Sequence, residues 1–211
     1  MKLGRMVSAR RRLAAYWGCA AVNVVAVAVD AKLLKPASKV VLMPLLLSWA
    51  RSEQCPPLLA AALLASAAGD AFLLRDEWLV PGMASFAVAH ACYVALFLSR
   101  STDRSWREVA AYGLAFLTVI ATLVPEDPRL RVPVAAYASL LAATAVTSRW
   151  HGARTGLGGA VFAASDSLIA ARLAGKDFPL RDALVMATYT VGQYLLTSGT
   201  ARTAPAPTLA V

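Results

Sequence analysis

The sequence carries too little charge for a water-soluble protein of its size. Only 16% of its 211 residues are charged, whereas a soluble domain carries roughly 25%. Hydrophobic residues make up 59% of the chain, and its mean hydropathy is +0.59. The 12 acidic residues are too few, and the apolar runs too long, for a disordered chain or a charged coiled coil. The composition therefore predicts an integral membrane protein.

Cysteine and histidine are also scarce. The three cysteines are an odd number and two of them lie in apolar runs, so no disulfide framework is expected. With only His90 and His151 and no His-Glu-x-x-His motif, no metal site is expected. The chain has no Gly-x-Ser-x-Gly elbow, and its glycine run at 156–159 opens an apolar segment instead of following a strand. These absences argue against zinc hydrolases, serine esterases and phosphate-binding loops.

Eight apolar segments approach the roughly 20 residues that a helix needs to cross a bilayer. Short polar segments rich in turn residues separate them. The expected helices lie at about residues 13–31, 33–50, 57–75, 78–98, 108–124, 132–148, 156–174 and 182–199. The expected fold class is an all-α membrane protein, a compact bundle of eight transmembrane helices. It divides into a basic cytoplasmic N-terminus (1–12), the helical domain (13–199) and a cytoplasmic tail (200–211).

The basic residues indicate the orientation of this bundle. The net charge is +9, but most Lys and Arg residues stand between apolar runs and not on one basic face, so no nucleic acid partner is expected. Of the 21 Lys and Arg residues, 12 fall on the side of the N-terminus and 8 on the opposite side, with Arg172 inside a span. Since basic loops stay inside, both termini are expected in the cytoplasm. The basic start also fits a signal peptide, but its apolar run is longer than usual and seven more follow.

A faint internal repeat relates the two halves of the chain. At a constant offset of 96 residues, Asp70 lies over Asp166 and Tyr93 over Tyr189. Because four spans form each unit, the halves would be two parallel four-helix repeats, and membrane proteins built this way often place their site between the halves. Alanine-rich helices also align by chance, so duplication stays one of two explanations.

Two aspartates are the best candidates for chemistry. Asp70 and Asp166 lie inside apolar segments, where an ionisable residue is costly enough to suggest a function. Each follows a small residue, Gly69 or Ser165, that allows close approach of a neighbouring helix. Two facing carboxyls can share a proton, as acid/base catalysis requires. The alternative is that each carboxyl only satisfies helix packing.

One cavity is expected to collect the remaining polar residues of the spans. Four of them, Lys35, Lys39, Tyr137 and Tyr189, fall in the same half of the expected bundle as the aspartates, and His90 lies near mid-depth. Three pairs share a helix face through i, i+3 or i, i+4 spacing, and one tyrosine joins them. These candidates for substrate binding are Lys35, Lys39, His90, Tyr93, Tyr137, Tyr189 and Gln193. The lysines suit an anionic headgroup but also suit helix-end anchoring. The histidine and tyrosines suit packing or the membrane interface equally well.

Several short motifs occur together from about residue 32 to 195. They are Lys35-Pro36 with Met43-Pro44-Leu45, the run Gly69-Asp70-Ala71-Phe72-Leu73-Leu74, Gly82 with Phe86, His90-x-x-Tyr93, Gly159-Ala160-x-Phe162-x-x-Ser165-Asp166, and Tyr189-x-x-x-Gln193. In this order the set resembles the YhhN-like lysoplasmalogenases, which are eight-span membrane proteins. The arginine-rich N-terminus, Arg172 and the Pro-containing tail depart from that pattern without touching its motifs.

This resemblance implies hydrolysis of the vinyl ether bond of a lysoplasmalogen, giving a fatty aldehyde and a glycerophospho-alcohol. Asp70 and Asp166 would then form an acid/base pair, Lys35 or Lys39 would hold the phosphate, and no cofactor would be required. The implied partners are a lysophospholipid substrate and membrane lipids, and the implied location is the inner membrane if the protein is bacterial. The alternative from another class is a proton-coupled transporter of a small solute or lipid, which membrane-embedded aspartates also fit. A sensor or scaffold would leave the acidic pair unexplained.

Overall fold

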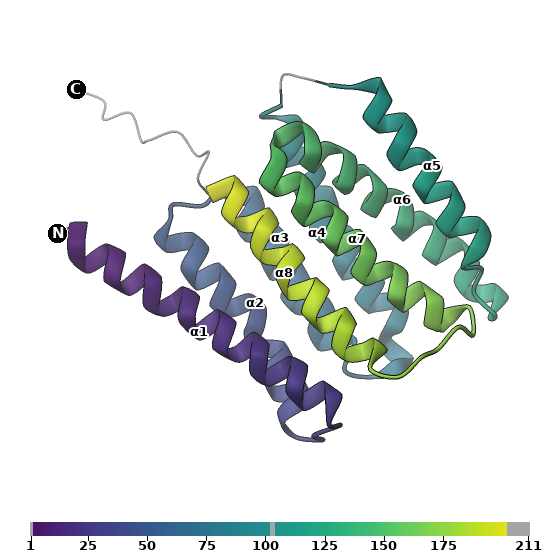
Figure 1. The fold of residues 1–211 in the computed structure, drawn as a ribbon, viewed down its shortest axis with the longest axis horizontal. Helices are drawn as coiled ribbons and strands as arrows, with labels where there is room; N and C mark the ends of the chain where they lie inside the picture. The colour runs from purple at the N-terminus through teal and green to yellow at the C-terminus, as the bar shows by residue number, and fades with distance from the viewer. Residues whose placement is uncertain (1, 102–103, 202–211) are drawn as a thin grey trace.

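The computed structural model describes residues 2–101 and 104–201. Over these residues the chain forms eight α-helices and one 3-10 turn, and no strand (Figure 1). The helices are α1 (Lys2–Ala28), α2 (Leu34–Ser52), α3 (Pro57–Phe72), α4 (Leu79–Leu98), α5 (Trp106–Thr122), α6 (Pro128–His151), α7 (Ala153–Leu173) and α8 (Arg181–Ala201), with the 3-10 turn η1 (Asp76–Trp78) between α3 and α4. The expected all-α class and the eight helices are confirmed.

Local sequence explains where α3 and α6 start. Helices α3 and α6 each begin with a proline, Pro57 or Pro128, because the first helical position has no intrahelical partner for an N–H group. At α6 the side chain of Asp127 accepts a hydrogen bond of 2.9 Å from the backbone nitrogen of Arg129, which caps the helix. This cap explains why α6 begins before the expected residue 132.

The N-terminal helix starts earlier than expected. Helix α1 begins at Lys2 and not near residue 13, because the basic segment consists largely of good helix formers such as Arg, Ala and Leu. The basic N-terminus is thus the first part of α1. Most of the expected tail, residues 202–211, lies outside the described residues.

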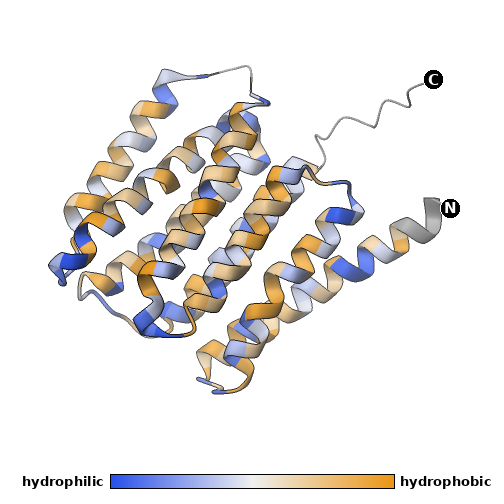
Figure 2. Ribbon diagram, turned by 180° about the vertical axis from the view of Figure 1, so that it is seen from behind, coloured by the Kyte–Doolittle hydropathy of each residue, from blue (hydrophilic) through white to orange (hydrophobic). Residues whose placement is uncertain are grey.

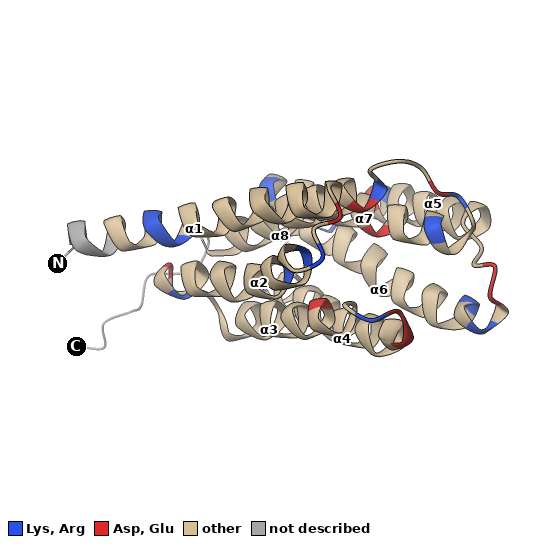
Figure 3. Cartoon of the chain, turned by 90° about the horizontal axis from the view of Figure 1, so that it is seen from below, with Lys and Arg blue, Asp and Glu red and all other residues tan. Residues whose placement is uncertain are grey.

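The helices pack in two layers. Seen from below in Figure 3, α1, α8, α7 and α5 form one layer and α2, α3, α4 and α6 the other. The most extensive contacts join α7 to α8 and α3 to α4, whereas α5 contacts mainly α6 and buries no residue. Between the layers lies a core of large side chains, among them Leu42, Leu63, Tyr93, Phe97 and Phe162, all at most 1% exposed. Each layer buries one side of its helices against the other.

The described helices also bear on the predicted repeat. Helix α3 begins at residue 57 and α7 at residue 153, which preserves the offset of 96, and each packs against the helix that follows it. The aspartates Asp70 and Asp166 therefore stand at the same position from the start of their helices. Duplication of an ancestral unit stays a prediction.

Part of the bundle is long and apolar enough to cross a membrane. Two described segments, 76–98 and 128–151, are long and apolar enough to cross a membrane, and α3 is apolar but shorter. Apolar residues are spread along all the helices in Figure 2, and charged residues gather mainly near helix ends in Figure 3. Large apolar side chains such as Val25, Leu114 and Val132 are 60%, 68% and 78% exposed. That all eight helices span a membrane stays a prediction.

Candidate active site

One cavity, partly open to solvent, lies at the end of the bundle where α2, α4, α6 and α8 begin and α3 and α7 end. Its lining is mostly apolar, with Leu73, Leu79, Met83, Val134 and Ile169 among the contributing residues. The polar lining residues come from five helices and are Lys39, Asp70, Tyr137, Ser165, Asp166 and Tyr189. An apolar wall with a few polar groups is typical of small-molecule sites.

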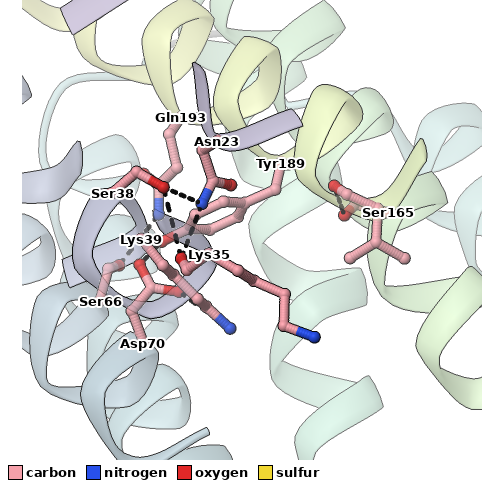
Figure 4. A network of polar contacts seen from close by, with 10 residues as sticks. Asn23, Lys35, Ser38, Lys39, Ser66, Asp70, Ser165, Tyr189 and Gln193 are labelled. Atoms are coloured by element: carbon pink, nitrogen blue, oxygen red, sulfur yellow. Dashed lines mark hydrogen bonds and ion pairs between the residues drawn. The ribbon is translucent and has the colours of Figure 1, made fainter. Parts of the chain in front are cut away.

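Asp70 stands in the last turn of α3 and is 2% exposed. Its Oδ2 accepts a hydrogen bond of 2.7 Å from the Tyr189 hydroxyl, and its Oδ1 lies 3.8 Å from Nζ of Lys39 (Figure 4). Gly69 precedes it because the Phe86 ring occupies that space: a Cβ at residue 69 would lie 2.6 Å from the ring. The carboxyl is thus held by a hydroxyl and an ammonium group.

Asp166 also lines the cavity, from the middle of α7, and is half-buried. The hydroxyl of Tyr137 donates a hydrogen bond to its Oδ2. The preceding residue, Ser165, donates a hydrogen bond of 2.9 Å to the carbonyl oxygen of Val185 and so joins α7 to α8. The two aspartates therefore contribute to one cavity, and each binds a different tyrosine.

His90 is fully buried on α4 and does not line the cavity. Its Nε2 lies 3.1 Å from the Tyr137 hydroxyl, and its Nδ1 lies 3.0 Å from Oγ1 of Thr144 on α6. The ring also meets Phe162 edge-on, with centroids 4.9 Å apart. His90 therefore reaches the cavity only through Tyr137.

Tyr93 and Gln193 bind each other away from the cavity. Both are 0% exposed, and the Tyr93 hydroxyl donates a hydrogen bond of 2.7 Å to Oε1 of Gln193. The Gln193 amide donates in turn to Oγ of Ser66 at 3.0 Å. This arrangement joins α3, α4 and α8 beneath the site, so these two candidates lie behind the cavity wall.

The two lysines have different surroundings although they are one helical turn apart. Lys39 lines the cavity beside Asp70. Lys35 forms an ion pair of 2.7 Å with Asp30, and both side chains are substantially exposed. The hydrogen bond and charge of Lys35 hold the pKa of the Asp30 carboxyl below its ordinary value. Lys35 therefore stands outside the cavity, near the loop that precedes α2.

Asn23 is a buried polar residue that the sequence reasoning missed. It is 0% exposed on α1, and its Nδ2 donates to Oγ of Ser38 at 2.8 Å and to the carbonyl oxygen of Lys35 at 3.1 Å (Figure 4). These bonds hold the first turns of α2, and hence the two lysines, against α1. As the single asparagine of the chain, inside an apolar run, it could have been found by the same reasoning as the aspartates.

Among the described residues, no group of three or more His, Cys, Asp or Glu side chains could hold a metal ion. The three cysteines are free thiols, and all are partly buried. The polar groups available in the cavity are therefore two carboxyls, two phenols, one hydroxyl and one ammonium. This set can donate and accept protons and can bind an anion.

Comparison with known proteins relates the chain to a single family. It is 34% identical over 157 residues to human "Lysoplasmalogenase TMEM86B" (71% of this chain, 66% of that protein), and 33% identical over 141 residues to the rat protein of the same name (66% and 60%). It is also 32% identical over 157 residues to "Lysoplasmalogenase" of Mycobacterium tuberculosis (67% and 59%). The chain thus spans about three fifths to two thirds of the length of these relatives. No solved structure matches it. Because residues 32–200 match the model of the YhhN family, the chain belongs to the YhhN family, as its motifs predicted.

Proposed function

We propose that this chain is a membrane-embedded lysoplasmalogenase, which hydrolyses the vinyl ether bond of a lysoplasmalogen to a fatty aldehyde and a glycerophospho-alcohol. The observation that carries the proposal is the placing of Asp70 and Asp166 in the lining of one largely apolar cavity. The names of the relatives support the same reaction. The apolar wall suits the hydrocarbon chain of such a substrate, because burying methylene groups is favourable.

Hydrolysis of a vinyl ether needs an acid and a base. A proton is first transferred to the carbon that is remote from oxygen, which leaves an oxocarbenium ion. Water then attacks this ion and loses a proton, and the resulting hemiacetal collapses to aldehyde and alcohol. Paired carboxyls perform the equivalent work on the oxocarbenium ion of glycosidases. One carboxyl of the pair Asp70 and Asp166 supplies the proton, and the other, as a carboxylate, stabilises the positive charge and activates water.

The headgroup is bound at the open end of the cavity. Lys39 is engaged with Asp70, whereas Lys35 lies one turn nearer the loop with an exposed ammonium group. A phosphate would exchange with the exposed carboxylate of Asp30 at modest cost, since exposed ion pairs contribute little. Of the two expected phosphate ligands, Lys35 is therefore the one we assign to the headgroup, and Tyr189 and Tyr137 orient the carboxyls.

The membrane setting follows from the same proposal. All eight helices cross the bilayer, both termini lie in the cytoplasm, and in a bacterium the membrane is the inner one. The exposed apolar side chains around the bundle support this arrangement, because contiguous exposed apolar surface marks contact with lipid or protein. The cavity then opens near the non-cytoplasmic end.

The test is release of aldehyde by the purified protein in detergent, where a transporter would show no turnover. A lysoplasmalogen should yield trapped aldehyde, and its saturated alkyl analogue should yield none. Asp70→Asn and Asp166→Asn should each lose about 10²–10⁴ in kcat, the range of a general acid or base. The double variant should be little worse than the worse single one, as is usual for groups that act together.

Asp76→Asn provides the matched control. Asp76 lies exposed in η1 at the same end of the bundle, so its neutralisation should leave kcat unchanged. A folded Asp166→Asn variant that releases aldehyde at the wild-type rate would refute the proposed mechanism.

A further inference from the structure

The two carboxyls of the cavity have unequal partners. Asp70 has the Lys39 ammonium group 3.8 Å away and accepts a hydrogen bond from Tyr189. None of the ion pairs among the described residues includes Asp166, whose partner is the neutral hydroxyl of Tyr137. An ammonium group stabilises the charged form of a nearby carboxyl. When the pair shares one proton, Asp70 is therefore the carboxylate and Asp166 the neutral acid.

A chain of hydrogen bonds ends at Asp166. Because Tyr137 donates its single hydroxyl proton to Oδ2 of Asp166, its oxygen is left to accept a proton from Nε2 of His90, 3.1 Å away. A neutral imidazole with its proton on Nε2 accepts at Nδ1. Oγ1 of Thr144 lies 3.0 Å from Nδ1 and also 3.0 Å from the carbonyl oxygen of Leu140, so its single proton has two acceptors within reach. His90 thus donates to Tyr137, and Tyr137 donates to Asp166.

This direction determines which oxygen of Asp166 can act. Oδ2 is occupied as an acceptor, so the carboxylic proton belongs on Oδ1, which makes no hydrogen bond to the described residues. After Oδ1 gives up its proton, the bond from Tyr137 becomes a bond to a carboxylate and strengthens. The chain therefore favours the charge that develops on Asp166 during proton transfer.

We propose, on the basis of the function proposed above, that Asp166 is the general acid and Asp70 the general base, and that His90 is a positioning residue that acts on Asp166 through Tyr137. His90 touches neither the cavity nor the substrate. Its effect is to keep the Tyr137 hydroxyl directed at Oδ2 of Asp166.

The assigned roles close a balanced cycle. Oδ1 of Asp166 gives its proton to the remote vinyl carbon, forming a C–H bond and an oxocarbenium ion. The carboxylate of Asp70 takes a proton from water as the water oxygen bonds to the cationic carbon. In the collapse, Asp70 returns this proton to the glycerol oxygen as the C–O bond breaks, and Asp166 takes the hydroxyl proton of the hemiacetal. One water is consumed, and both carboxyls regain their starting forms.

Infrared spectroscopy tests the assignment without any turnover. A neutral carboxyl group has a C=O stretch that stands apart from those of carboxylates and amides and shifts on exchange into D₂O. At neutral pH the wild-type protein should show this band, Asp166→Asn should lose it, and Asp70→Asn should keep it. Loss of the band in Asp70→Asn with retention in Asp166→Asn, or its absence from the wild type, would overturn the assignment. If the wild-type protein released no aldehyde, the proposed function would be overturned. The infrared result would still hold, because it does not depend on turnover.

Kinetics test the role of His90. The amide nitrogen of Gln can donate to Tyr137 from about the place of Nε2, whereas Leu cannot donate. His90→Leu should lower kcat roughly three- to tenfold, the effect of one hydrogen bond, with little change in KM, and His90→Gln should restore much of the loss. Thr144→Val, which keeps the side-chain shape and removes the hydroxyl beside Nδ1, should lower kcat in the same way.

Tyr16→Phe is the matched control for these variants. Its hydroxyl is also buried and donates 2.7 Å to the carbonyl oxygen of Thr190, but it does not line the cavity. It should therefore keep the wild-type kcat. Equal loss in His90→Gln and His90→Leu, or full activity in both His90→Leu and Thr144→Val, would show that the histidine only fills space and would overturn its positioning role.

Discussion

The close approach of α7 and α8 gives the sharpest test of the fold around the site. Gly158 of α7 faces the backbone of α8: a Cβ at this position would lie 2.7 Å from the nitrogen of Leu196 and 3.1 Å from the carbonyl oxygen of Gly192, against 3.4–4 Å for an ordinary contact. These are backbone atoms, which cannot swing aside as a side chain can. Gly158→Ala therefore requires the two helices to move apart.

The size of the effect follows from two opposed contributions. Overpacking of this kind costs about 1–3 kcal/mol, and since the backbone must move we expect the upper part of that range. Alanine recovers about 0.5–1 kcal/mol through its better helix propensity. The net loss is about 1–2 kcal/mol, and each kcal/mol lowers Tm by about 2–4 °C in a chain of this length.

The matched control is Gly18→Ala on α1, where nothing lies within 4 Å of the added Cβ. Only the helix-propensity gain applies there, so this variant should unfold at or slightly above the wild-type temperature. Thermal unfolding of the three proteins in one detergent, followed by circular dichroism at a fixed scan rate, measures the difference. If Gly158→Ala were as stable as Gly18→Ala, α7 and α8 would not pack backbone to backbone, and the placing of Asp166 relative to Tyr189 would lose its support.

Three further predictions concern the reaction and the topology. In D₂O the released aldehyde should carry one deuterium on the carbon next to the carbonyl group, as mass spectrometry of the trapped product can measure; no deuterium there would exclude protonation at carbon. Lys35→Met should raise KM for phosphate-bearing substrates more than it lowers kcat. Lys39→Met should mainly lower kcat, because it removes the cation beside Asp70. Steady-state kinetics measure both effects, and the reverse result would mean that Lys39 binds the phosphate and Lys35 does not. A reporter active only in the cytoplasm should be active when fused after Val211, and one active only outside the cytoplasm should be silent; the opposite result would invert the topology.

Helix positions were largely predictable, because apolar runs and turn residues act locally. The structure differs most at α1, which includes the basic segment, and at α6, which the capping residue Asp127 starts early. Both differences have local causes that were visible in the sequence: strong helix formers in the first case, and an Asp-Pro pair in the second. Hydropathy alone placed the start of each helix at the start of its apolar run, which is too late for α1 and α6.

The aspartates were also identifiable, but their partners were not. A carboxyl in an apolar run stands out because its burial is costly wherever the helix packs. That Tyr189 binds Asp70 and Tyr137 binds Asp166 depends on residues 119 and 29 positions apart. The offset of 96 pairs Asp70 with Asp166 but says nothing of which tyrosine faces which. The catalytic roles of both stay predictions.

The lysines show where helical spacing is insufficient. Lys35 and Lys39 share a face at i, i+4, yet one binds Asp30 in the preceding turn and the other reaches Asp70 on α3. Asp30 adopts a positive φ of 50°, which Asp tolerates in turns, and this brings its carboxylate back to α2. Separation of the two lysines is thus decided by a loop conformation and by the neighbouring helix.

The sequence by itself determined the number of helices, their approximate limits, the family and the two carboxyls within apolar helices, since these depend on composition, local propensity and the cost of burying charge. Only the tertiary structure decided that His90 lies behind Tyr137, that Tyr93 and Gln193 bind each other outside the cavity, and that Lys39 and not Lys35 accompanies Asp70. The physical reason is that contacts between helices depend on how each helix is rotated and how closely the small residues let the backbones approach, and neither is a property of any one segment.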